Sequence, residues 1–443
     1  MSRKTHIAHE LAAHLLSGAW SRRQLQARAL SYLGKQAPKA RKQLIDDVLA
    51  AQSTAYPPSP RNLARTLLQC PTFNRAASHL LKQSLPLPAV LQSPKFAPIP
   101  AFQGLAAPPV ATPGELAEWL GISIEQLDWL ADSKRQHGRT NIPILHNYAY
   151  RLVPKASGQS RLIEAPKARL KALQRRILRD ILDLAPVHLA AHGFVRGRSC
   201  ISGASVHAGE AVVACLDLKD FFSSISAARV HGLFRSFGYP WAVARLLTGL
   251  CTTSTPHSVF TRLPEEARPD WTTRKTLEAP HLPQGASTSP ALANLCAWRL
   301  DQRLAALGRA VGANYTRYAD DLTFSGDSTF GRRVDRVITL VQTIVREEGF
   351  RINARKTRVM RSAGRQCVTG VIVNERVNVE RTSYDTLKAV LHNCRRHGPT
   401  HENRAGHAAF RAQLDGRVNW VEQLHPERGA KLRRAFEAID WTK

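Results

Sequence analysis

Two adjacent carboxylates, Asp320 and Asp321, lie in the stretch NYTRYADDLTFSGD and are the first residues here that could do chemistry. The β-prone residues 314–318 and 322–324 predict two short strands, so the acids would lie at a hairpin turn. Successive side chains of a strand face opposite sides, but at a tight turn both acids can flank one metal region. The alternative is ordinary turn chemistry, because Asp is favoured in turns whatever their function.

A third carboxylate, Asp217, ends the apolar run 212–216 in VVACLDLKDFFSSI. A continuous apolar run predicts a buried strand, and an acid at its end is costly unless it is solvated, paired or bound to metal. Asp220 lies nearer a predicted turn, and we expect it to be structural. Asp217 with Asp320 and Asp321 therefore predicts a two-metal site, in which two ions about 4 Å apart activate a hydroxyl and stabilise the leaving group. Carboxylate and phosphate oxygens favour magnesium.

The composition indicates the partner of such a site. The 443 residues carry a formal net charge of +29, which predicts attraction to a polyanion, most simply a nucleic acid. No basic segment adjoins an apolar span long enough to cross a membrane, and the N-terminus is a poor signal peptide, so we expect no membrane association and a cytoplasmic protein. Seven scattered cysteines without a C-x-x-C pair argue against a zinc ribbon and a disulfide framework.

The elements that must position the acids follow from the order of the chain. Residues 1–83 predict an N-terminal helical extension, 84–113 a Pro-rich linker that is semi-extended rather than packed, 114–373 the core that holds the acids, and 374–443 a basic helical region. Thr112 is a predicted N-cap of a helix pair over 113–130, which suits packing better than DNA reading.

Two further stretches could contact a substrate. Residues 148–154 and 160–165 predict a β-hairpin that carries Lys155 and Arg161, which could hold a triphosphate or simply be solvated. The loop LPQG, with Gln284, enters a helix near Ser289 whose small residues permit close approach by a substrate or close packing on a sheet.

The ordered series RLIEAP, AHGFVRGRS, VVACLDLKDFFSSI, LPQGASTSPALANL, YADD, EEGFRINARKTRV and VTGVIVN resembles the motif series of reverse transcriptases. Within that class it is similar to the bacterial retron enzymes, whose VTG signature matches Val368, Thr369 and Gly370. In ISGASVHAG, Ala204 and His207 match the retron Asn-Ala-x-x-His element, but Gly203 replaces the Asn. This departure puts in doubt the RNA contact ascribed to that element.

The resemblance implies an α+β right-hand polymerase: fingers, a palm with an antiparallel sheet, and a small helical thumb over 374–443, preceded here by the helical extension. It implies magnesium, as two ions, on the three aspartates. It also implies a catalytic Lys356 that protonates or neutralises pyrophosphate, unless this residue is a surface lysine. Phe222 would exclude a nucleotide 2′-OH, unless it is a core aromatic. The other implied contacts are Lys155, Arg161 and Gln284 for the nucleotide and, more weakly, Arg196, Arg198 and His207 for RNA; a core histidine is the alternative for His207.

The implied function is an RNA-directed DNA polymerase that uses dNTPs to copy part of a cognate non-coding RNA into single-stranded DNA. Priming would come from an RNA 2′-OH, and a toxic effector protein would be restrained by the complex in defence against phage. The rival readings are another prokaryotic reverse transcriptase, of the group II intron, diversity-generating or defence-associated kind, and a non-catalytic RNA-binding scaffold. The intact aspartates disfavour the scaffold.

Overall fold

The computed structural model describes residues 3–18, 20–33, 38–51, 58, 60–82, 94–132, 136–137, 142–154 and 160–442. The chain forms two compact units, the first from residues 1–186 and 222–296 and the second from residues 187–221 and 297–443. Lys155 and residues 84–93 of the predicted linker lie outside the described residues. Among those described, no helix is both long and apolar enough to cross a membrane.

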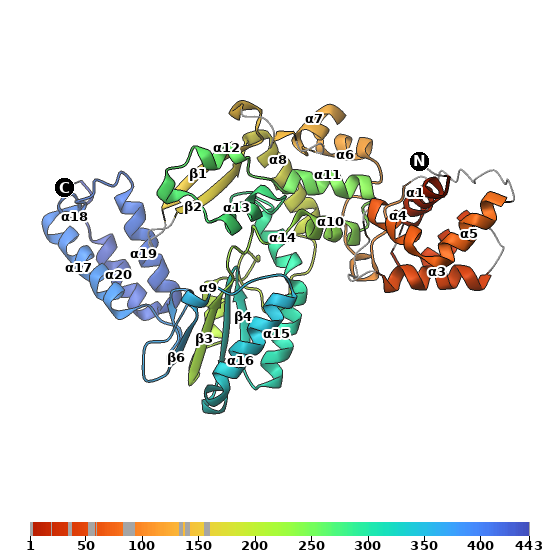
Figure 1. Cartoon of the computed structure of the whole chain (residues 1–443). Helices are drawn as coiled ribbons and strands as arrows, with labels where there is room; N and C mark the ends of the chain where they lie inside the picture. The colour runs from red at the N-terminus through yellow and green to blue at the C-terminus, as the bar shows by residue number, and fades with distance from the viewer. Residues whose placement is uncertain are drawn as a thin grey trace. The chain divides into compact units, whose positions relative to one another are not determined.

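The first unit begins with the predicted helical extension, which has a hydrophobic core of its own. Apolar residues at helical spacing, among them Ile7, Leu11, Leu63 and Phe73, are fully buried in this core. Its helices are α1 (Arg3–Leu15), α2 (Arg22–Leu33), α3 (Pro38–Ala50), α4 (Pro60–Gln69) and α5 (Pro71–Lys82), coloured red to orange in Figure 1. The extension is tied to the rest of its unit, because the buried Arg235 donates a hydrogen bond of 2.8 Å to the carbonyl of Leu16.

The described part of the predicted linker is packed, so the expectation of an unpacked spacer is wrong there. The backbone amides of Ala97 and Ile99 donate to the carbonyls of Gly238 and Ser236. Phe102, in the short helix η1 (Pro100–Phe102), stacks on Phe237 with ring centroids 4.7 Å apart. The prolines do make this segment extended, but the aromatic residues between them give it an apolar face that packs.

The predicted helix pair forms as α6 (Pro113–Leu120) and α7 (Ile124–Leu130). The Thr112 side chain accepts from the Glu115 amide, which confirms the predicted N-cap, and Ser123 caps α7 in the same way. Both helices pack on α11 (Trp241–Cys251), whose residues are mostly apolar. This arrangement is the packing pair rather than a DNA-reading motif.

The predicted β-hairpin forms from β1 (Tyr148–Pro154) and β2 (Ser160–Pro166), which pair antiparallel. The remaining elements of this unit are helical: η3 (Pro143–Leu145), α8 (Ala168–Ile177), η4 (Leu178–Leu182), α10 (Ala227–Ser236), α12 (His257–Thr261), η5 (Glu265–Ala267), α13 (Trp271–Glu278) and α14 (Ser289–Cys296). α14 begins at Ser289, and the sequence predicted the start of a helix near this residue.

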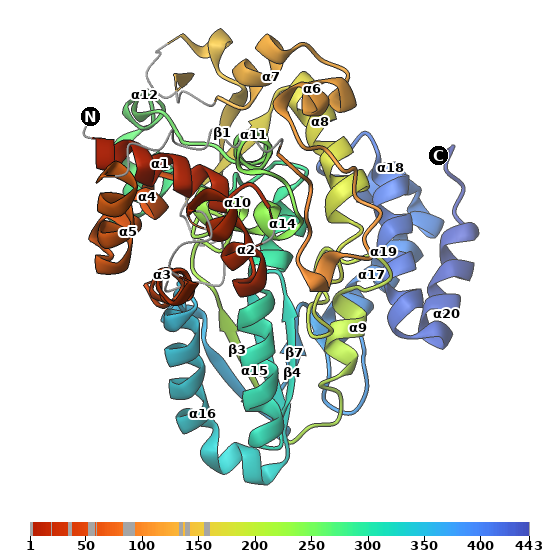
Figure 2. The ribbon, with the colours of Figure 1, turned by 90° about the vertical axis from the view of Figure 1, so that its right-hand side faces the viewer.

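The second unit is built on a four-stranded antiparallel sheet of order β4-β5-β3-β6. Its strands are β3 (Val212–Asp217), β4 (Asn314–Tyr318), β5 (Asp321–Gly326) and β6 (Arg358–Arg361). Helices α15 (Trp298–Ala310) and α16 (Ser328–Glu347) lie against the sheet (Figures 1 and 2). α9 (Cys200–Ser205) contacts β4, and the short helix η6 (Ala354–Lys356) precedes β6.

The VTG stretch forms a tight hairpin. β7 (Cys367–Val368) and β8 (Val371–Ile372) pair through Thr369 and Gly370, whose φ angles of 48° and 86° suit a two-residue hairpin turn. The basic C-terminal region is helical as predicted: α17 (Arg381–His397), α18 (Pro399–Glu402), α19 (Phe410–Leu424) and α20 (Pro426–Glu437). One core joins α17, α19 and α20 to the hairpin and to Val213 of β3.

Candidate active site

Two of the three predicted acids meet in the sheet of the second unit. Asp217, the last residue of β3, pairs directly with Asp321, the first residue of β5. Directly opposed residues of an antiparallel pair point to the same face, with Cβ atoms about 5 Å apart. The two carboxylates are therefore neighbours because the strands place them there, as the sequence required for a shared site.

Asp320 lies in the turn between β4 and β5. Tyr318 pairs with Asp321, so the turn consists of Ala319 and Asp320, and Ala319 has a φ of 55°, which an L-residue adopts only at a cost. The Leu218 amide donates a 2.8 Å hydrogen bond to the Asp320 carbonyl and so ties the turn to the chain that follows β3. Asp220 also has a left-handed φ, of 52°, which fits the structural role expected for it.

The Asp217 carboxylate, which is almost fully buried, has two partners from the segment before β6. Lys356 Nζ donates to Oδ2 at 2.7 Å, and Asn353 Nδ2 donates to Oδ1 at 3.0 Å. The Asn353 amide also donates to the Asp217 carbonyl at 2.7 Å. The hydrogen bond to Asp217 raises the pKa of Lys356, so this lysine stays charged and offsets one of the acids.

The acid cluster has more negative charge than Lys356 balances. Burial, together with the charges of Asp320 and Asp217, raises the pKa of Asp321 to about 6. The cluster offers only oxygen ligands, and its carboxylates lie close enough together to disfavour their ionisation. A hard divalent cation such as magnesium binds ligands of this kind. In the part of the chain that the structure describes, no three Asp, Glu, His or Cys side chains are arranged so that they could hold a metal ion together. The carboxylate oxygens of the three aspartates are therefore the type of ligand that magnesium binds, but their positions do not form a metal site.

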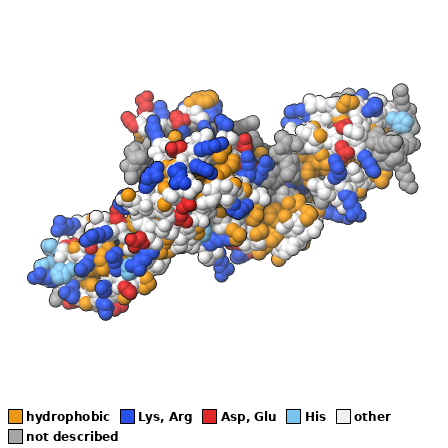
Figure 3. All heavy atoms as spheres, turned by 90° about the horizontal axis from the view of Figure 1, so that it is seen from below, with side chains coloured by type: hydrophobic (Ala, Val, Ile, Leu, Met, Phe, Trp, Pro, Cys, Tyr) orange, Lys and Arg blue, Asp and Glu red, His pale blue; other side chains and the backbone are white. Residues whose placement is uncertain are grey.

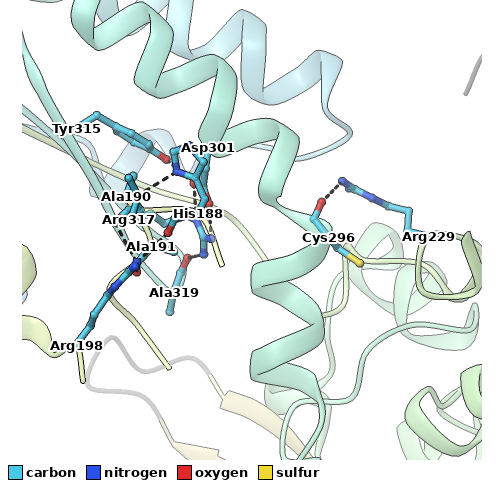
Figure 4. A network of polar contacts seen from close by, with 11 residues as sticks. His188, Ala190, Ala191, Arg198, Arg229, Cys296, Asp301, Tyr315, Arg317 and Ala319 are labelled. Atoms are coloured by element: carbon cyan, nitrogen blue, oxygen red, sulfur yellow. Dashed lines mark hydrogen bonds and ion pairs between the residues drawn. The ribbon is translucent and has the colours of Figure 1, made fainter. Parts of the chain in front are cut away.

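A buried ion pair lies next to the turn formed by Ala319 and Asp320 (Figure 4). Arg317 of β4 and Asp301 of α15 have no exposed side-chain surface and join through two bonds, Nε to Oδ1 at 2.7 Å and Nη2 to Oδ2 at 2.6 Å. Arg317 Nη1 donates to the carbonyl of Ala319 at 3.1 Å, and the Tyr315 hydroxyl donates to Asp301 at 2.9 Å. Strand alternation explains this, since Tyr315 and Arg317 share the face that lies on α15.

The AHGFVRGRS loop runs beside β4. The Arg317 amide donates to the Ala190 carbonyl, and the His192 amide donates to the Arg317 carbonyl. Arg198 Nη1 donates to the carbonyls of His188, Leu189 and Ala191, so this guanidinium holds the loop together (Figure 4). Arg196 is exposed. Of the two arginines expected to contact RNA, Arg196 is the more exposed, and Arg198 is half-buried.

His207 is a core histidine in this structure. Its ring is fully buried, with Nδ1 2.7 Å from Ser325 Oγ and Nε2 2.7 Å from Thr316 Oγ1. Burial lowers its pKa to about 3, so it stays neutral. Both nitrogens are used inside the protein, and the geometry favours the core alternative over the RNA contact. A Cβ at Gly203 would lie 3.2 Å from that of His192, so the Asn typical of the family would press on His192 here.

The nucleotide-contact candidates belong to the first unit. Arg161 is exposed on β2 opposite Val153, and Lys155 lies outside the described residues. Gln284 is half-buried, and its carbonyl accepts from the Glu164 amide at 2.9 Å. Phe222 is also half-buried, in contrast to Phe221, which is buried.

Sequence reasoning missed three kinds of site residue. Asn353 lies three residues before Lys356 and could have been suspected as a second partner for Asp217. Arg317 stands inside the YADD stretch, but nothing in the sequence indicates that its partner is Asp301. Glu164 and His281, which form a buried pair in the first unit, are separated by more than a hundred residues and carry no joint signal.

The surface is consistent with a polyanionic partner. Lys and Arg side chains are spread widely over the face in Figure 3 rather than gathered in a single patch. This distribution agrees with the net charge of +29 and suits contact with an extended phosphate backbone.

The chain is similar to known proteins over most of its described core. Residues 153–387 match the family model of the reverse transcriptase (RNA-dependent DNA polymerase). The chain is 45% identical over 294 residues to the retron Mx65 reverse transcriptase of Myxococcus xanthus, an overlap of 66% of this chain and 64% of that protein. It is 37% identical over 338 residues to the retron Mx162 reverse transcriptase of the same organism, covering 73% of this chain and 65% of the relative. A similarity of 34% over 251 residues extends to the retron Ec86 reverse transcriptase of Escherichia coli, covering 56% of this chain and 70% of the relative. The chain thus spans slightly less than two thirds of the two Myxococcus relatives.

Proposed function

Since the chain belongs to the reverse transcriptase family, we propose that it is a retron-type RNA-directed DNA polymerase that copies part of a cognate structured non-coding RNA into single-stranded DNA. The observation that carries the proposal is the direct pairing of Asp217 with Asp321 beside the Asp320 turn. A non-catalytic scaffold would have no use for three acids whose mutual repulsion the fold must bear.

The reaction is nucleotidyl transfer. A hydroxyl oxygen attacks the α-phosphorus of a dNTP, a new phosphorus–oxygen bond forms, the bond to the bridging oxygen breaks, and pyrophosphate leaves with its electron pair. Magnesium ions held by Asp217, Asp320 and Asp321 would lower the pKa of the hydroxyl and stabilise the charge on the leaving oxygens.

Side chains around the aspartates position these acids and offset negative charge. Asn353 and Lys356 orient Asp217 through its two oxygens, and Lys356 brings a positive charge that can also face pyrophosphate. Arg317 fixes the Ala319 carbonyl and with it the turn that carries Asp320. Arg161 and Lys155 would hold the triphosphate, and Gln284 would border the incoming nucleotide.

Priming from an RNA 2′-OH, on a guanosine of the cognate RNA, is the finer part of the proposal, together with a toxic effector partner and a role in defence against phage. The similarity to retron reverse transcriptases supports priming, and the resemblance of the motif series alone supports the effector and the defence role. The basic helices α17 to α20 provide a surface for RNA, whose stems would be recognised mainly by shape.

Cells that express the chain with the DNA flanking its gene should accumulate single-stranded DNA joined to RNA through a 2′–5′ branch. The attached RNA would make the product sensitive to ribonuclease at one end only, and debranching enzyme would release a DNA of discrete length on a denaturing gel. The matched control is the same cell carrying Asp320→Ala together with Asp321→Ala, which should make no such DNA. DNA that persists in this double variant, or a product with no branch, contradicts the proposal.

Phe222→Ala should relax the selection of dNTPs over rNTPs by roughly 10- to 100-fold, because the smaller side chain leaves room for a 2′-OH. Single-nucleotide extension of a primer with each nucleotide type measures kcat/KM for both. Phe221→Leu is the control, since Phe221 is buried against Phe350 and should affect stability and not selectivity. Unchanged selectivity in Phe222→Ala would assign that ring to packing.

A further inference from the structure

A buried acid and a buried histidine meet in the first unit, away from the aspartates. Glu164 of β2 and His281 each expose 1% of their side chains, and His281 Nε2 lies 2.9 Å from Glu164 Oε2. The other carboxylate oxygen, Oε1, accepts from the Thr255 hydroxyl at 2.6 Å. A buried carboxylate is costly unless it is paired, so this pair must contribute something the fold uses.

The main chain of Glu164 holds the loop that contains Gln284. The Glu164 amide donates to the Gln284 carbonyl at 2.9 Å. Gly285 has a φ of 138°, and a Cβ there would lie 3.0 Å from the Glu164 carbonyl oxygen, so the loop approaches β2 as closely as a glycine permits. His281, three residues before Gln284, is fixed on its other side by two backbone hydrogen bonds with Thr253. Glu164 thus binds the segment 281–285 through side chain and main chain together.

The hydrogen-bond partners fix the number of protons in the pair. His281 Nδ1 lies 2.7 Å from the Ala279 carbonyl, which can only accept, so Nδ1 carries a proton. Nε2 faces a carboxylate oxygen, so one further proton must lie between these two atoms, on the nitrogen or on the oxygen. The hydrogen-bonded pair of Glu164 and His281 therefore contains one proton more than a neutral histidine and a carboxylate would have.

We propose that Glu164 and His281 are positioning residues, which hold one shared proton and thereby fix the Gln284 loop against β2 for binding of the incoming nucleotide. The inference rests on the proposed polymerase function for its consequence and on the contacts above for its structure. β2 also carries Arg161, so the same strand would present a triphosphate contact and anchor the loop.

The proton also gives the proposal a pH signature. Burial alone would lower the pKa of His281, but the charge and hydrogen bond of Glu164 and the bond to Ala279 outweigh it and raise the pKa. A raised histidine pKa means that the contribution to stability is complete below the ordinary value and is lost as pH rises through the folded value. Tyr148 and Tyr150 of β1 respond to the charge of Glu164, and their pKa values are raised too, first by burial, so they stay neutral in that window.

Glu164→Gln removes the shared proton and keeps the hydrogen bonds to His281 and Thr255. The amide can donate to Nε2 and accept from Thr255, so a neutral His281 with its proton on Nδ1 keeps every contact. We expect this variant to match the wild type at neutral pH. In the wild type KM for dNTP should rise at alkaline pH, whereas in Glu164→Gln it should stay flat.

Glu164→Leu removes both hydrogen bonds of the side chain. We expect KM for dNTP to rise roughly tenfold at neutral pH with a smaller change in kcat, because a displaced loop weakens binding of the correctly placed nucleotide. Hydrogen exchange of the amides of 281–286 should become faster in this variant and stay slow in Glu164→Gln. His257→Leu is the matched control, because it removes a second His–Glu contact of 2.9 Å, with Glu278, in which the histidine is exposed.

The outcomes distinguish this inference from the function on which it rests. A folded wild type without DNA synthesis overturns the polymerase proposal, and exchange at 281–286 then still tests the contact itself. An active wild type whose KM has no alkaline rise, or whose rise persists in Glu164→Gln, overturns the proton assignment. Unchanged KM and unchanged exchange in Glu164→Leu overturn the positioning role. Should Glu164→Leu fail to fold, the pH profile of Glu164→Gln decides.

Discussion

Asp321→Asn should lower DNA synthesis on an RNA template by on the order of 10³-fold, the scale of losing a preorganised charge at the reacting groups. Asparagine has the same shape and can still accept a hydrogen bond, but it lacks the negative charge with which Asp321 would help to hold a magnesium ion. Initial rates of dNTP incorporation at saturating substrate measure the effect.

The same substitution should leave the metal-free protein at least as stable as the wild type. Because the pKa of Asp321 is raised to about 6, the folded state disfavours the ionised acid. Stability is therefore lost as pH rises from the ordinary carboxyl pKa to about 6, and the whole penalty is present at alkaline pH. Thermal unfolding in EDTA at alkaline pH should give a Tm equal to or above that of the wild type.

Asp335→Asn is the matched control, because Asp335 is an exposed acid on α16 of the same unit. It should change neither rate nor Tm. An Asp321→Asn protein that keeps more than a tenth of the activity would contradict the metal assignment. If Asp321→Asn lowered both the activity and the Tm, Asp321 would have a structural role, because a functional acid is expected to lower the stability of the folded protein.

The strand that ends at Asp217 could be predicted from the sequence alone. The apolar run before it predicted a buried strand that ends at the acid, and β3 ends there. The YADD hairpin was predicted in the same way, although β5 begins one residue earlier and extends two residues further than expected. These features are local: strand periodicity and turn chemistry are written in consecutive residues.

The contacts around the acids were not predictable, because they depend on partners far apart in the chain. Lys356 was implied by family resemblance, but its bond to Asp217 and the second partner Asn353 come from the path of the segment before β6. The sequence singled out His207 but could not decide between an RNA contact and a core histidine. Only the register of β4 and β5 brings Thr316 and Ser325 to its two nitrogens. Proline content misled in the linker, where Phe102 packs on Phe237.

Asp301→Leu should be the most damaging single change to stability, lowering the free energy of unfolding of the second unit by about 3–5 kcal/mol. It leaves the Arg317 guanidinium buried with no counter-charge, and the Tyr315 hydroxyl loses its acceptor. Denaturant unfolding measures the loss. Arg381→Met is the control, because its ion pair with Asp385 at the surface of α17 should contribute no more than about 1 kcal/mol.

The double variant Asp301→Leu with Arg317→Met separates stability from catalysis. Apolar side chains of similar volume replace both charges, so most of the stability should return. The Ala319 carbonyl, however, still lacks the donor that Arg317 supplied, and Ala319 keeps a φ of 55° that its surroundings must hold. We therefore expect a folded double variant whose DNA synthesis stays depressed by roughly 10-fold or more, since a small displacement of a reacting group is costly. If activity returned together with stability, Arg317 would be a packing residue, and the turn of Ala319 and Asp320 would hold its shape without it.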